Sequence, residues 1–574
     1  MTRPRCLRCR AAQLLAAVAL FAWLAPAAAE QARPPAAAIA AAHPLAVDAG
    51  LEILAAGGNA FDAAVTVAAV LAVVEPYGSG LGGGGFFLLH RAVDEFETMI
   101  DARERAPLTA SEEMYLDSQR NPIPELSRAG PLAAGIPGLP DALVHLSEKY
   151  GRLPLKHTLA AAIEFARKGV PIDAQYRRLA QLRREVIAAS PEAARIFLDE
   201  GFGPNEGFVV KQPELASTLE LMVAKGRSGF YDGRVAQQLV QGVRAAGGIW
   251  SLQDLAEYKV EERDPMRGSY RGMKVTAASL PSSGGVVLLQ MLGILAPIDI
   301  DRLEVVDRAQ TLVEAMRLAY RDRAAHLGDP DHVDVDTDGL LANGYLASLR
   351  DELQRNLKNP PDPNPLPPPS EGRSTTHFSI LDRDGNRVAA TLSINSPFGS
   401  GFMPPGTGVL LNNEMDDFVA KPGVKNIYGL TGARANLIAP GKRPLSSMTP
   451  SFLETPEALV LLGTPGGSRI ITMVYLVALE VASGRGTVED WIALKRFHHQ
   501  YLPDVIEYEP GALSPAQVAA LDKRGYALKE TTRPYGNMQA VVWLKKENRV
   551  AAAADPRGGG RARVETRSAG DAEN

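Results

Sequence analysis

The sequence predicts an α+β fold in which layered β-sheets are covered by helices. Helix-like and strand-like blocks are mixed along the 574 residues without a strict βαβ rhythm. The composition is that of an ordinary globular protein, with 46% hydrophobic and 22% charged residues. A chain of this size can bury one large core or form two to three units.

The first thirty residues predict a secretory signal peptide over residues 1–29. A basic start with four arginines precedes the apolar run 14–24, and an Ala-x-Ala cleavage site at 27–29 precedes Glu30. We therefore expect an exported protein, periplasmic or secreted, with an uncleaved anchor as the alternative. No later stretch is long and apolar enough to span a membrane.

Removal of this segment also defines the chemistry of the mature chain. Both cysteines, Cys6 and Cys9, lie within it, so the mature chain has no disulfide and must rely on its core. Loss of the four arginines takes the formal charge from −5 to −9 (−5 − 4). An acidic chain argues against nucleic acid as a partner.

The expected elements follow in chain order. Residues 40–90 predict two helices, a glycine-rich loop and a buried strand at 86–89, and further helices are expected at 141–150 and 159–168. Later blocks predict a strand at 273–277, helical segments to about 356, strands within 375–394, 408–412 and 450–462, a helix at 470–481, and an α/β segment to about 555. The tail after Pro556 is expected to be frayed.

Two motifs do not predict a cofactor or metal site. Residues 78–83 match G-x-G-x-x-G, but they follow a helix and precede a strand, the reverse of a dinucleotide site. His498 and His499 are adjacent and cannot share one face of a helix or strand. We therefore expect no cofactor and no bound metal.

The segment Ser374-Thr375-Thr376-His377 is the most informative part of the chain. It follows the proline-rich stretch 360–369, an extended tether, and it opens a predicted strand. A chain break before Thr375 would give one residue both a hydroxyl and an α-amine with a pKa of about 7.7–8.0. Such an amine can take the hydroxyl proton near neutral pH. The alternative is an ordinary threonine at a strand start.

The residues after Thr375 predict a β-hairpin whose register can be derived. Pairing apolar with apolar side chains sets Phe378 opposite Ala390 and Ile380 opposite Val388. The same register sets Thr375 opposite Ser393 and His377 opposite Thr391. Side chains in directly opposed positions lie roughly 4.5–5.5 Å apart at Cβ, so Ser393 can hydrogen-bond Thr375.

A second glycine-rich segment, residues 463–469, runs from a strand into the helix at 470–481. Gly466 and Gly467 leave backbone N–H groups accessible at a helix start, an arrangement that suits a developing oxyanion. A tight strand-to-helix turn explains the same residues equally well.

Several blocks of this sequence together resemble the γ-glutamyltranspeptidase (glutathione hydrolase) family. The resemblance extends from about residue 37 to 556 and rests on residues 78–85, 101–104, 280–285, 375–377, 410–418, 443–448 and 463–469. It implies the four-layer αββα fold of N-terminal-nucleophile hydrolases and a precursor that cuts itself between Ser374 and Thr375. The products are a large subunit, 30–374, and a small subunit, 375–574, which associate as a heterodimer.

The resemblance also implies roles for single residues. Thr375 is the nucleophile, Ser393 stands where many members have threonine, and Gly466 and Gly467 hold the oxyanion. The substrate α-carboxylate is assigned to Arg103, Ser446 and Ser447, and the α-ammonium to Asn395, Glu414 and Asp417. Tyr428 belongs to a lid over residues 421–429. Without the family, Arg103 would be read as a surface ion pair and Asp416-Asp417 as a solvated turn.

The implied activity is γ-glutamyl transfer and hydrolysis, acting on glutathione and other γ-glutamyl compounds, with amino acids or peptides as acceptors. One alternative is a glutaryl or cephalosporin acylase of the same fold. Its substrates lack the α-ammonium, so Asn395, Glu414 and Asp417 argue against it. The other alternative is an exported binding protein that never matures.

Overall fold

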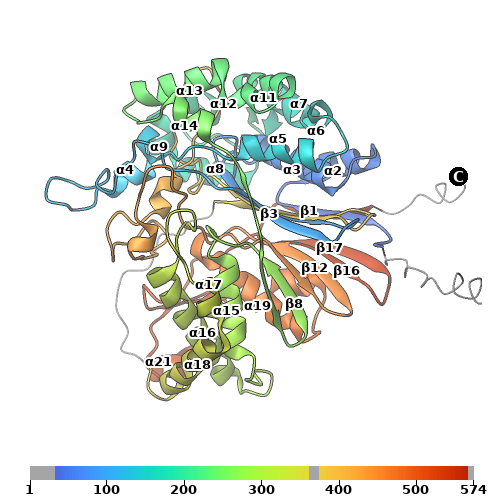
Figure 1. The fold of residues 1–574 in the computed structure, drawn as a ribbon, viewed down its shortest axis with the longest axis vertical. Coiled ribbons are helices and arrows are strands. Elements are labelled where there is room, and N and C mark those ends of the chain that lie inside the picture. Colours follow the sequence, from blue (N-terminus) through green and yellow to red (C-terminus); the bar gives the residue numbers. More distant parts are fainter. Residues whose placement is uncertain (1–32, 361–373, 566–574) are drawn as a thin grey trace, which may run out of the picture.

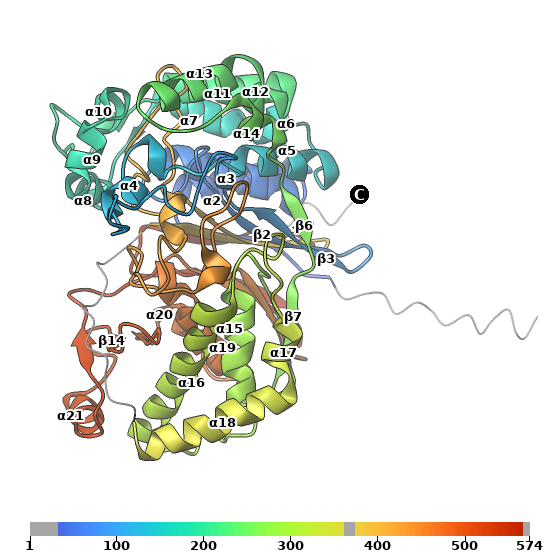
Figure 2. The same ribbon diagram turned by 60° about the vertical axis from the view of Figure 1, so that its left-hand side comes forward.

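The computed structural model describes residues 33–360 and 374–565, which form four layers in the order helix, sheet, sheet, helix (Figures 1 and 2). A seven-stranded sheet faces a six-stranded sheet, and all strand pairs within both are antiparallel. This is the αββα fold expected from the sequence. The signal segment 1–29 and most of the proline-rich tether lie outside the described residues.

Each sheet brings together strands that are far apart in the sequence. From one edge to the other, the seven-stranded sheet comprises β18 (Arg561–Glu565), β1 (Ala37–Ala41), β9 (Thr376–Leu381), β10 (Arg387–Ser393), β2 (Gly84–Arg91), β3 (Phe96–Ala102) and β6 (Glu261–Arg263). The six-stranded sheet comprises β17 (Arg549–Ala554), β16 (Gln539–Leu544), β12 (Ala458–Gly463), β11 (Ser451–Glu454), β8 (Met273–Ala277) and β7 (Met266–Tyr270). Smaller sheets are formed by β13 (Phe497–His498), β14 (Ile506–Tyr508) and β15 (Leu528–Glu530), and by β4 (Val170–Pro171) and β5 (Val209–Val210).

The helices divide into two groups (Figure 1). The group on the side of the seven-stranded sheet comprises α2 (Pro44–Ala55), α3 (Ala60–Val74), α4 (Pro124–Arg128), α5 (Leu139–Lys149), α6 (Leu155–Thr158), α7 (Ala160–Lys168), α8 (Ala174–Leu182), α9 (Arg184–Ala188), α10 (Pro191–Phe197), α11 (Pro213–Lys225), α12 (Ser228–Tyr231), α13 (Gly233–Ala245) and α14 (Leu252–Glu257). The other group comprises α15 (Gly284–Leu295), α16 (Val305–His326), α17 (Thr337–Leu341), α18 (Asn343–Lys358), α19 (Ile470–Ala482), α20 (Val488–Ala493) and α21 (Pro515–Lys523). Short 3-10 turns are η1 (Pro131–Ala133), η2 (Glu414–Asp417), η3 (Arg434–Asn436) and η4 (Gly467–Arg469).

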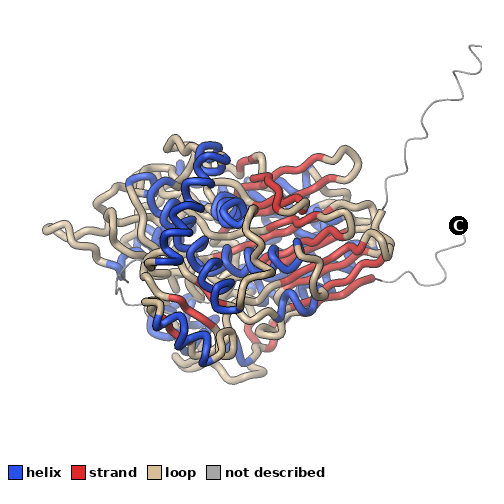
Figure 3. Tube along the Cα trace, turned by 90° about the horizontal axis from the view of Figure 1, so that it is seen from below, coloured by secondary structure: helices blue, strands red, loops and turns tan. Residues whose placement is uncertain are grey.

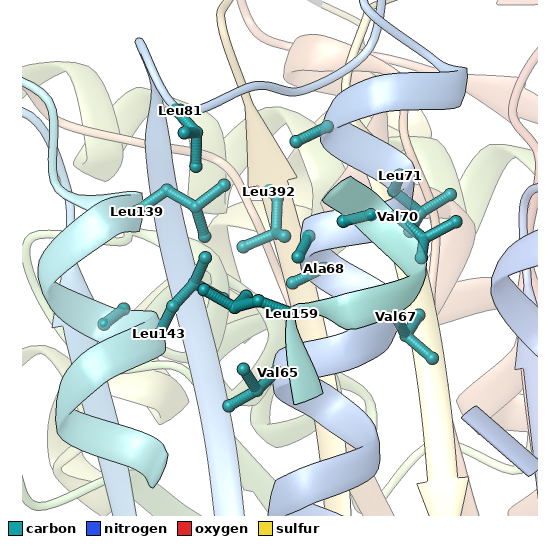
Figure 4. Packing of buried hydrophobic residues seen from close by; sticks show 14 of the residues in the cluster. Val65, Val67, Ala68, Val70, Leu71, Leu81, Leu139, Leu143, Leu159 and Leu392 are labelled. Atoms are coloured by element: carbon teal, nitrogen blue, oxygen red, sulfur yellow. The ribbon is translucent and has the colours of Figure 1, made fainter. Parts of the chain in front are cut away.

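Helix α3 shows how sequence and layer position agree. Its N-terminus carries a capping box between Asn59 and Asp62, which satisfies the first free N–H groups. Every residue of α3 is buried, because the sheet covers one side and further helices cover the other. Figure 4 shows this packing, with Val65 and Val70 of α3 near Leu143 and Leu159 of the covering segments and Leu392 of the sheet.

The two sheets pack through small and apolar side chains. Leu88, Leu381 and Ala389 of one sheet share a cluster with Phe452 and Leu461 of the other. Figure 3 shows that the strands of the two sheets run in similar directions, as expected for aligned sheet packing. This packing holds the ends of β9 and β10 against the strand-to-helix turn after β12.

The expected hairpin register is confirmed, since Phe378 pairs with Ala390 and Ile380 with Val388. The expected strand at 408–412 is wrong. That segment makes only an isolated bridge from Leu411 to Gly82, because its N–H groups bond to loop carbonyls.

The prediction of a frayed tail is also wrong for residues 561–565. This segment forms β18 and pairs with β1 at the edge of the seven-stranded sheet. Ala562 and Val564 pack against the core between the sheets, while Arg561 and Arg563 pair with Asp48 at 2.9 Å each.

Candidate active site

Thr375 lies immediately before β9, in the middle of the seven-stranded sheet. Its Oγ1 is 3.1 Å from the Oγ of Ser393, the last residue of β10. The contact is the one that the hairpin register predicts. The backbone N–H of Thr375 donates to the carbonyl oxygen of Gly78 at 3.2 Å.

The Thr375–Ser393 contact is extended by a neighbouring amide. The backbone N–H of Asn395 donates to Ser393 Oγ at 2.8 Å. A hydroxyl has one proton and two acceptor lone pairs, so Ser393 still has its proton and one lone pair for Thr375, and either hydroxyl can be the donor between them. Ser393 can therefore donate a hydrogen bond to the Thr375 hydroxyl.

The backbone at Thr375 is strained and held on both sides. Its φ is 105°, a region that a β-branched residue rarely adopts, and such strain costs about 1–3 kcal/mol. The Ser374 hydroxyl donates to the carbonyl oxygen of Tyr77 at 2.9 Å, and the Thr376 hydroxyl donates to the Glu75 carboxylate at 2.9 Å. The loop after α3 thus fixes three consecutive hydroxyl residues.

Gly466 and Gly467 form the turn between β12 and α19, with φ of 148° and 57°. Backbone N–H groups in the first turn of a helix have no acceptor within the helix, so these amides can serve a ligand. A Cβ on Gly467 would lie 2.5 Å from the ring of Tyr428. Glycine is therefore required there both for its backbone angle and for the close approach of the tyrosine.

A charged cluster lies in the same region. The fully buried Arg103 guanidinium donates from Nη2 to Asp417 Oδ2 at 2.5 Å, and its Nη1 lies 2.7 Å from Glu414 Oε2 as an ion pair. Nη1 is also 3.6 Å from Glu104. Arg103 and Glu414 lie within ion-pair distance but do not form a hydrogen bond. Among the described residues, neither Arg103 Nη1 nor Glu414 Oε1 has a hydrogen-bond partner.

One guanidinium therefore faces three carboxyl groups, of which Glu104 and Glu414 are buried and Asp417 is partly exposed. Burial, opposed by Arg103, raises the pKa of Glu104 to about 7 and raises the pKa of Glu414 well above its ordinary value. Burial alone would lower the pKa of Arg103, but Glu414, Asp417 and Glu104 together raise it. The cluster thus places one positive centre beside three carboxyl groups.

Two serines border this cluster. The Ser446 Oγ accepts from the backbone N–H of Met448 at 3.1 Å, and its carbonyl oxygen accepts from the Ser283 hydroxyl at 2.6 Å. The Ser447 Oγ accepts from the Arg323 guanidinium at 3.2 Å. Both serine hydroxyls therefore keep a proton that they can donate.

Tyr428, in the segment 421–429, lies beside these groups. The Tyr428 hydroxyl donates to the carbonyl oxygen of Asn395 at 2.9 Å, and the Gln500 side chain donates to the carbonyl oxygen of Tyr428 at 3.0 Å. Gln500 also accepts from the Ser468 hydroxyl at 2.6 Å. The Asn395 amide donates to Asn413 at 2.9 Å, which leaves its side-chain oxygen as an acceptor.

These side chains line one cavity, where the space free of protein atoms is about 320 Å³ including open solvent. Of the residues singled out in the sequence, Arg103, Thr375, Ser393, Asn395, Glu414, Asp417, Tyr428, Ser446, Ser447 and Gly467 line it. Gly466 adjoins it through Gly467, and Ser374 is buried beside it. The arrangement offers a hydroxyl for acyl transfer, amides for an oxyanion, and opposite charges for a zwitterionic head group.

Comparison with known proteins agrees with this geometry. A family model described as gamma-glutamyltranspeptidase matches residues 46–564. The chain belongs to the γ-glutamyltranspeptidase family. Over 528 residues and 90% of both chains it is 39% identical to the glutathione hydrolase proenzyme of Escherichia coli (strain K12). It is 40% identical over 518 residues to that of Pseudomonas aeruginosa, covering 89% of this chain and 91% of the relative.

Solved structures give the same fold. The cephalosporin acylase from Bacillus halodurans is similar with a TM-score of 0.82 at 26% identity, covering 94% of this chain and 98% of that chain. The γ-glutamyltranspeptidase of Helicobacter pylori is similar with a TM-score of 0.53 at 38% identity, covering 54% of this chain and 90% of that chain. Sequence identity is thus higher toward the γ-glutamyltranspeptidases than toward the acylase.

The adjacent histidines of the sequence have structural partners. His498 and His499 are buried and hydrogen-bonded, His498 to Thr472 and Gln500 and His499 to Asp504, at 2.9 Å each. Within residues 33–360 and 374–565, no group of three or more His, Cys, Asp or Glu side chains is placed to hold a metal ion. In the same ranges no helix is long and apolar enough to cross a membrane.

Three residues of the site are absent from the sequence-based expectations. Arg323 of α16 lines the cavity, Gln500 connects the lid to the turn before α19, and Glu75 binds Thr376. No local pattern marks any of them. The one available signal in the sequence was the glycine-rich segment 78–85, which follows Glu75. A loop with few side chains can approach another backbone closely.

Proposed function

We propose that this chain hydrolyses glutathione and other γ-glutamyl compounds, and transfers their γ-glutamyl group to amino acids or peptides. The observation that carries the proposal is the pocket that Thr375 lines together with the charged cluster of Arg103, Glu414 and Asp417. The relatives in E. coli and P. aeruginosa are named glutathione hydrolase proenzymes, which supports the same substrate class.

The proposal includes self-cleavage between Ser374 and Thr375. The Thr375 Oγ attacks the carbonyl carbon of Ser374, and its proton passes to the Thr375 nitrogen as the peptide C–N bond breaks, which frees the α-amine. Water then hydrolyses the resulting ester, which gives the Ser374 carboxylate and the Thr375 hydroxyl. The positive φ at Thr375 supports this step, because backbone strain raises the energy of the uncut chain. The products are the large subunit, 30–374, and the small subunit, 375–574, which remain associated.

Turnover then follows a ping-pong route. The Thr375 Oγ attacks the γ-carbonyl carbon while its proton passes to its own α-amine, and the N–H groups of Gly466 and Gly467 hold the oxyanion. The C–N bond breaks, and the leaving amine takes the proton. Water or an acceptor amine next attacks the γ-glutamyl ester, and Thr375 regains its hydroxyl proton.

The substrate head explains the charged cluster. It carries an α-carboxylate and an α-ammonium on one carbon, so each charge finds an opposite partner. Arg103 takes the carboxylate together with the hydroxyls of Ser446 and Ser447. Asn395, Glu414 and Asp417 take the ammonium, and Tyr428 closes the lid.

A glutaryl or cephalosporin acylase is the second candidate, favoured by the TM-score of 0.82 to the Bacillus halodurans acylase. A glutaryl donor has the carboxylate but no ammonium, and it would leave Glu414 and Asp417 without a new partner. Rates on γ-glutamyl and glutaryl p-nitroanilides separate the two activities. A faster rate on the glutaryl compound would overturn the γ-glutamyl assignment.

Thr375→Ala tests both chemical steps at once. We expect one uncut band and no measurable turnover, whereas Thr375→Ser, which keeps a hydroxyl, should still cut and react. Mass spectrometry of the purified chains reads the cut site directly. Two fragments from the Thr375→Ala chain would contradict the mechanism.

Export to the periplasm or the medium is part of the proposal. It rests on the signal pattern at residues 1–29. We expect no nucleic-acid partner and no membrane span once the signal is removed. N-terminal sequencing of protein recovered from outside the cytoplasm should give Glu30 and Thr375 as the two starts. A start at Met1 in that fraction would contradict cleavage of the signal.

A further inference from the structure

Arg323 is a cationic side chain of the cavity that the proposed chemistry does not use. It lies in the last turn of α16, is 5% exposed, and lines the cavity together with Thr375 and Arg103. Its Nε donates to the Ser283 hydroxyl at 2.9 Å, and its Nη2 donates to the Ser447 hydroxyl at 3.2 Å. Both partners are neutral.

Among the described residues, no carboxylate forms a direct ion pair with Arg323, although the charge of Asp417 acts on it from beyond ion-pair distance. On the same helix, Arg317 pairs with Glu314 and Asp504, and Arg321 pairs with Glu352. Arg323 forms no such ion pair with any carboxylate in the described ranges, and burial lowers its pKa. Arginine nevertheless stays protonated in proteins, and a buried charge without an opposite partner is costly. A site with this feature favours an anionic ligand.

The hydrogen bonds of Arg323 also fix the direction of the serine hydroxyls. A guanidinium can only donate, so Ser447 Oγ must accept from it and directs its own proton elsewhere. Ser283 accepts from Arg323 in the same way and passes its proton to the carbonyl oxygen of Ser446 at 2.6 Å. One side chain thus orients the hydroxyl of Ser447 and holds the backbone of Ser446.

We propose that Arg323 is a positioning residue and the second cation of the α-carboxylate site. It turns the Ser447 hydroxyl proton toward the donor carboxylate and supplies positive charge that Arg103 cannot, since Arg103 also faces three carboxyl groups. The inference rests on the proposed γ-glutamyl activity and deepens it. It assigns carboxylate recognition to two arginines from different segments of the large subunit.

The test compares two donors that differ only in the α-carboxylate. γ-Glutamyl p-nitroanilide has it, and 4-aminobutyryl p-nitroanilide lacks it while keeping the amine and the scissile bond. For Arg323→Gln we expect kcat/KM on the γ-glutamyl donor to fall roughly 10- to 100-fold, mainly through KM, and to change less than threefold on the other donor. Arg321→Gln, on the same helix outside the cavity, should affect neither donor.

The Arg323→Lys variant keeps the test decisive if Arg323→Gln folds poorly. A binding measurement does the same if 4-aminobutyryl p-nitroanilide reacts slowly. Lysine keeps the charge but cannot donate to Ser283 and Ser447 in the same fork, so its loss should lie between wild type and Arg323→Gln. Inhibition by L-glutamate should weaken in both variants, and inhibition by 4-aminobutyrate should not.

Two results would overturn the inference. An equal loss on both donors would show a general structural role, and no loss on the γ-glutamyl donor would show no role at all. A wild-type enzyme without γ-glutamyl activity would instead overturn the proposed function, so the two failures are distinguishable.

Discussion

Thr375 and Ser393 meet because two neighbouring strands pair in one register, whereas Arg103 and Asp417 meet although they are 314 residues apart. The first contact joins neutral hydroxyls and depends on the backbone of β9 and β10. The second joins buried charges carried by loops at the ends of different elements. The reactive side of the cavity is thus built by sheet geometry, and the recognition side by tertiary assembly.

This difference separates two properties that a mutation can change. In the proposed mechanism, self-cleavage needs Thr375, its hydroxyl neighbour and a strained backbone, all of which lie on the reactive side. Turnover in that mechanism needs these and the charged groups as well. Variants on the recognition side should therefore lose turnover and keep cleavage, whereas variants on the reactive side should impair both.

The largest expected effect that separates the two sides is that of Arg103→Lys. Lysine is a single point charge and cannot hold Glu414 and Asp417 together. Truncating one partner of a buried, hydrogen-bonded charge pair in a binding site costs about 2–5 kcal/mol of binding free energy, so kcat/KM on γ-glutamyl p-nitroanilide should fall by roughly 10²- to 10³-fold while the chain still cuts itself. Steady-state kinetics and gel bands measure the two effects separately.

Arg105→Lys is the matched control for that variant. Arg105 is two residues away and donates to the backbone carbonyl of Gly441 rather than to a carboxylate of the cavity. It should leave kcat/KM nearly unchanged. An uncut Arg103→Lys chain would show that the two sides of the cavity are not separable.

Gly467→Ala should have the next largest effect. The added Cβ would lie 2.5 Å from the Tyr428 ring at a φ of 57°, so both the lid and the turn must shift. Displacing an oxyanion donor lowers kcat by about 10²-fold or more. Gly484→Ala is the control, since its φ of 66° is similar but its Cβ would meet open space. Equal kcat losses in both variants would point to general destabilisation.

Ser393→Ala should slow cleavage and turnover together, by about tenfold each. The variant loses one neutral hydrogen bond to Thr375, which contributes roughly 0.5–1.5 kcal/mol, and it leaves the Asn395 N–H without its acceptor. Ser393→Thr keeps the hydroxyl and should retain most activity. The rate of precursor cutting and the initial rate of turnover are the measurements. A loss in turnover alone would move Ser393 to the recognition side.

The same comparison explains what the sequence could predict. The pairing of Phe378 with Ala390 follows from local alternation, and it places Ser393 beside Thr375 without further information. The helix expected at 470–481 is also found, as α19 over Ile470–Ala482. Local periodicity was sufficient for these elements.

Other features depend on contacts that local patterns do not encode. The direct pairing of Arg103 with Glu414 and Asp417 was not expected, because Arg103 was assigned to the substrate α-carboxylate and the two acidic residues to its α-ammonium. Arg323 carries no local signal, since an arginine in the last turn of a helix is ordinary. The edge strand β18 was missed because its five residues gain stability only by pairing with β1.

Glu75 is the exception on the reactive side, since it is an ionisable group among neutral hydroxyls. It is fully buried, and its carboxylate accepts from Thr376 at 2.9 Å and from the Tyr77 hydroxyl at 3.1 Å. Burial, partly opposed by these two hydrogen bonds, raises its pKa from 4.5 to about 7. The folded protein therefore keeps a proton that the unfolded chain releases near pH 4.5.

The sign of the resulting pH dependence is fixed. The stability contributed by this proton is fully present below pH 4.5 and is lost as the pH rises to about 7. A shift of this size corresponds to about 3 kcal/mol of unfolding free energy. Glu75→Gln cannot ionise, so its free energy of unfolding should fall less between pH 4.5 and 8. Both chains are best compared with Thr375→Ala present, because the uncut polypeptide unfolds as one molecule.

Urea midpoints at pH 4.5, 6 and 8 measure this smallest effect. Relative to its parent, the Glu75→Gln chain should gain stability as the pH rises, with most of the gain below pH 7. Parallel curves for the two chains would show that Glu75 is ionised in the fold. In that case the strained segment at Thr375 would lie beside a negative charge, and the reactive side would no longer be the neutral half of the cavity.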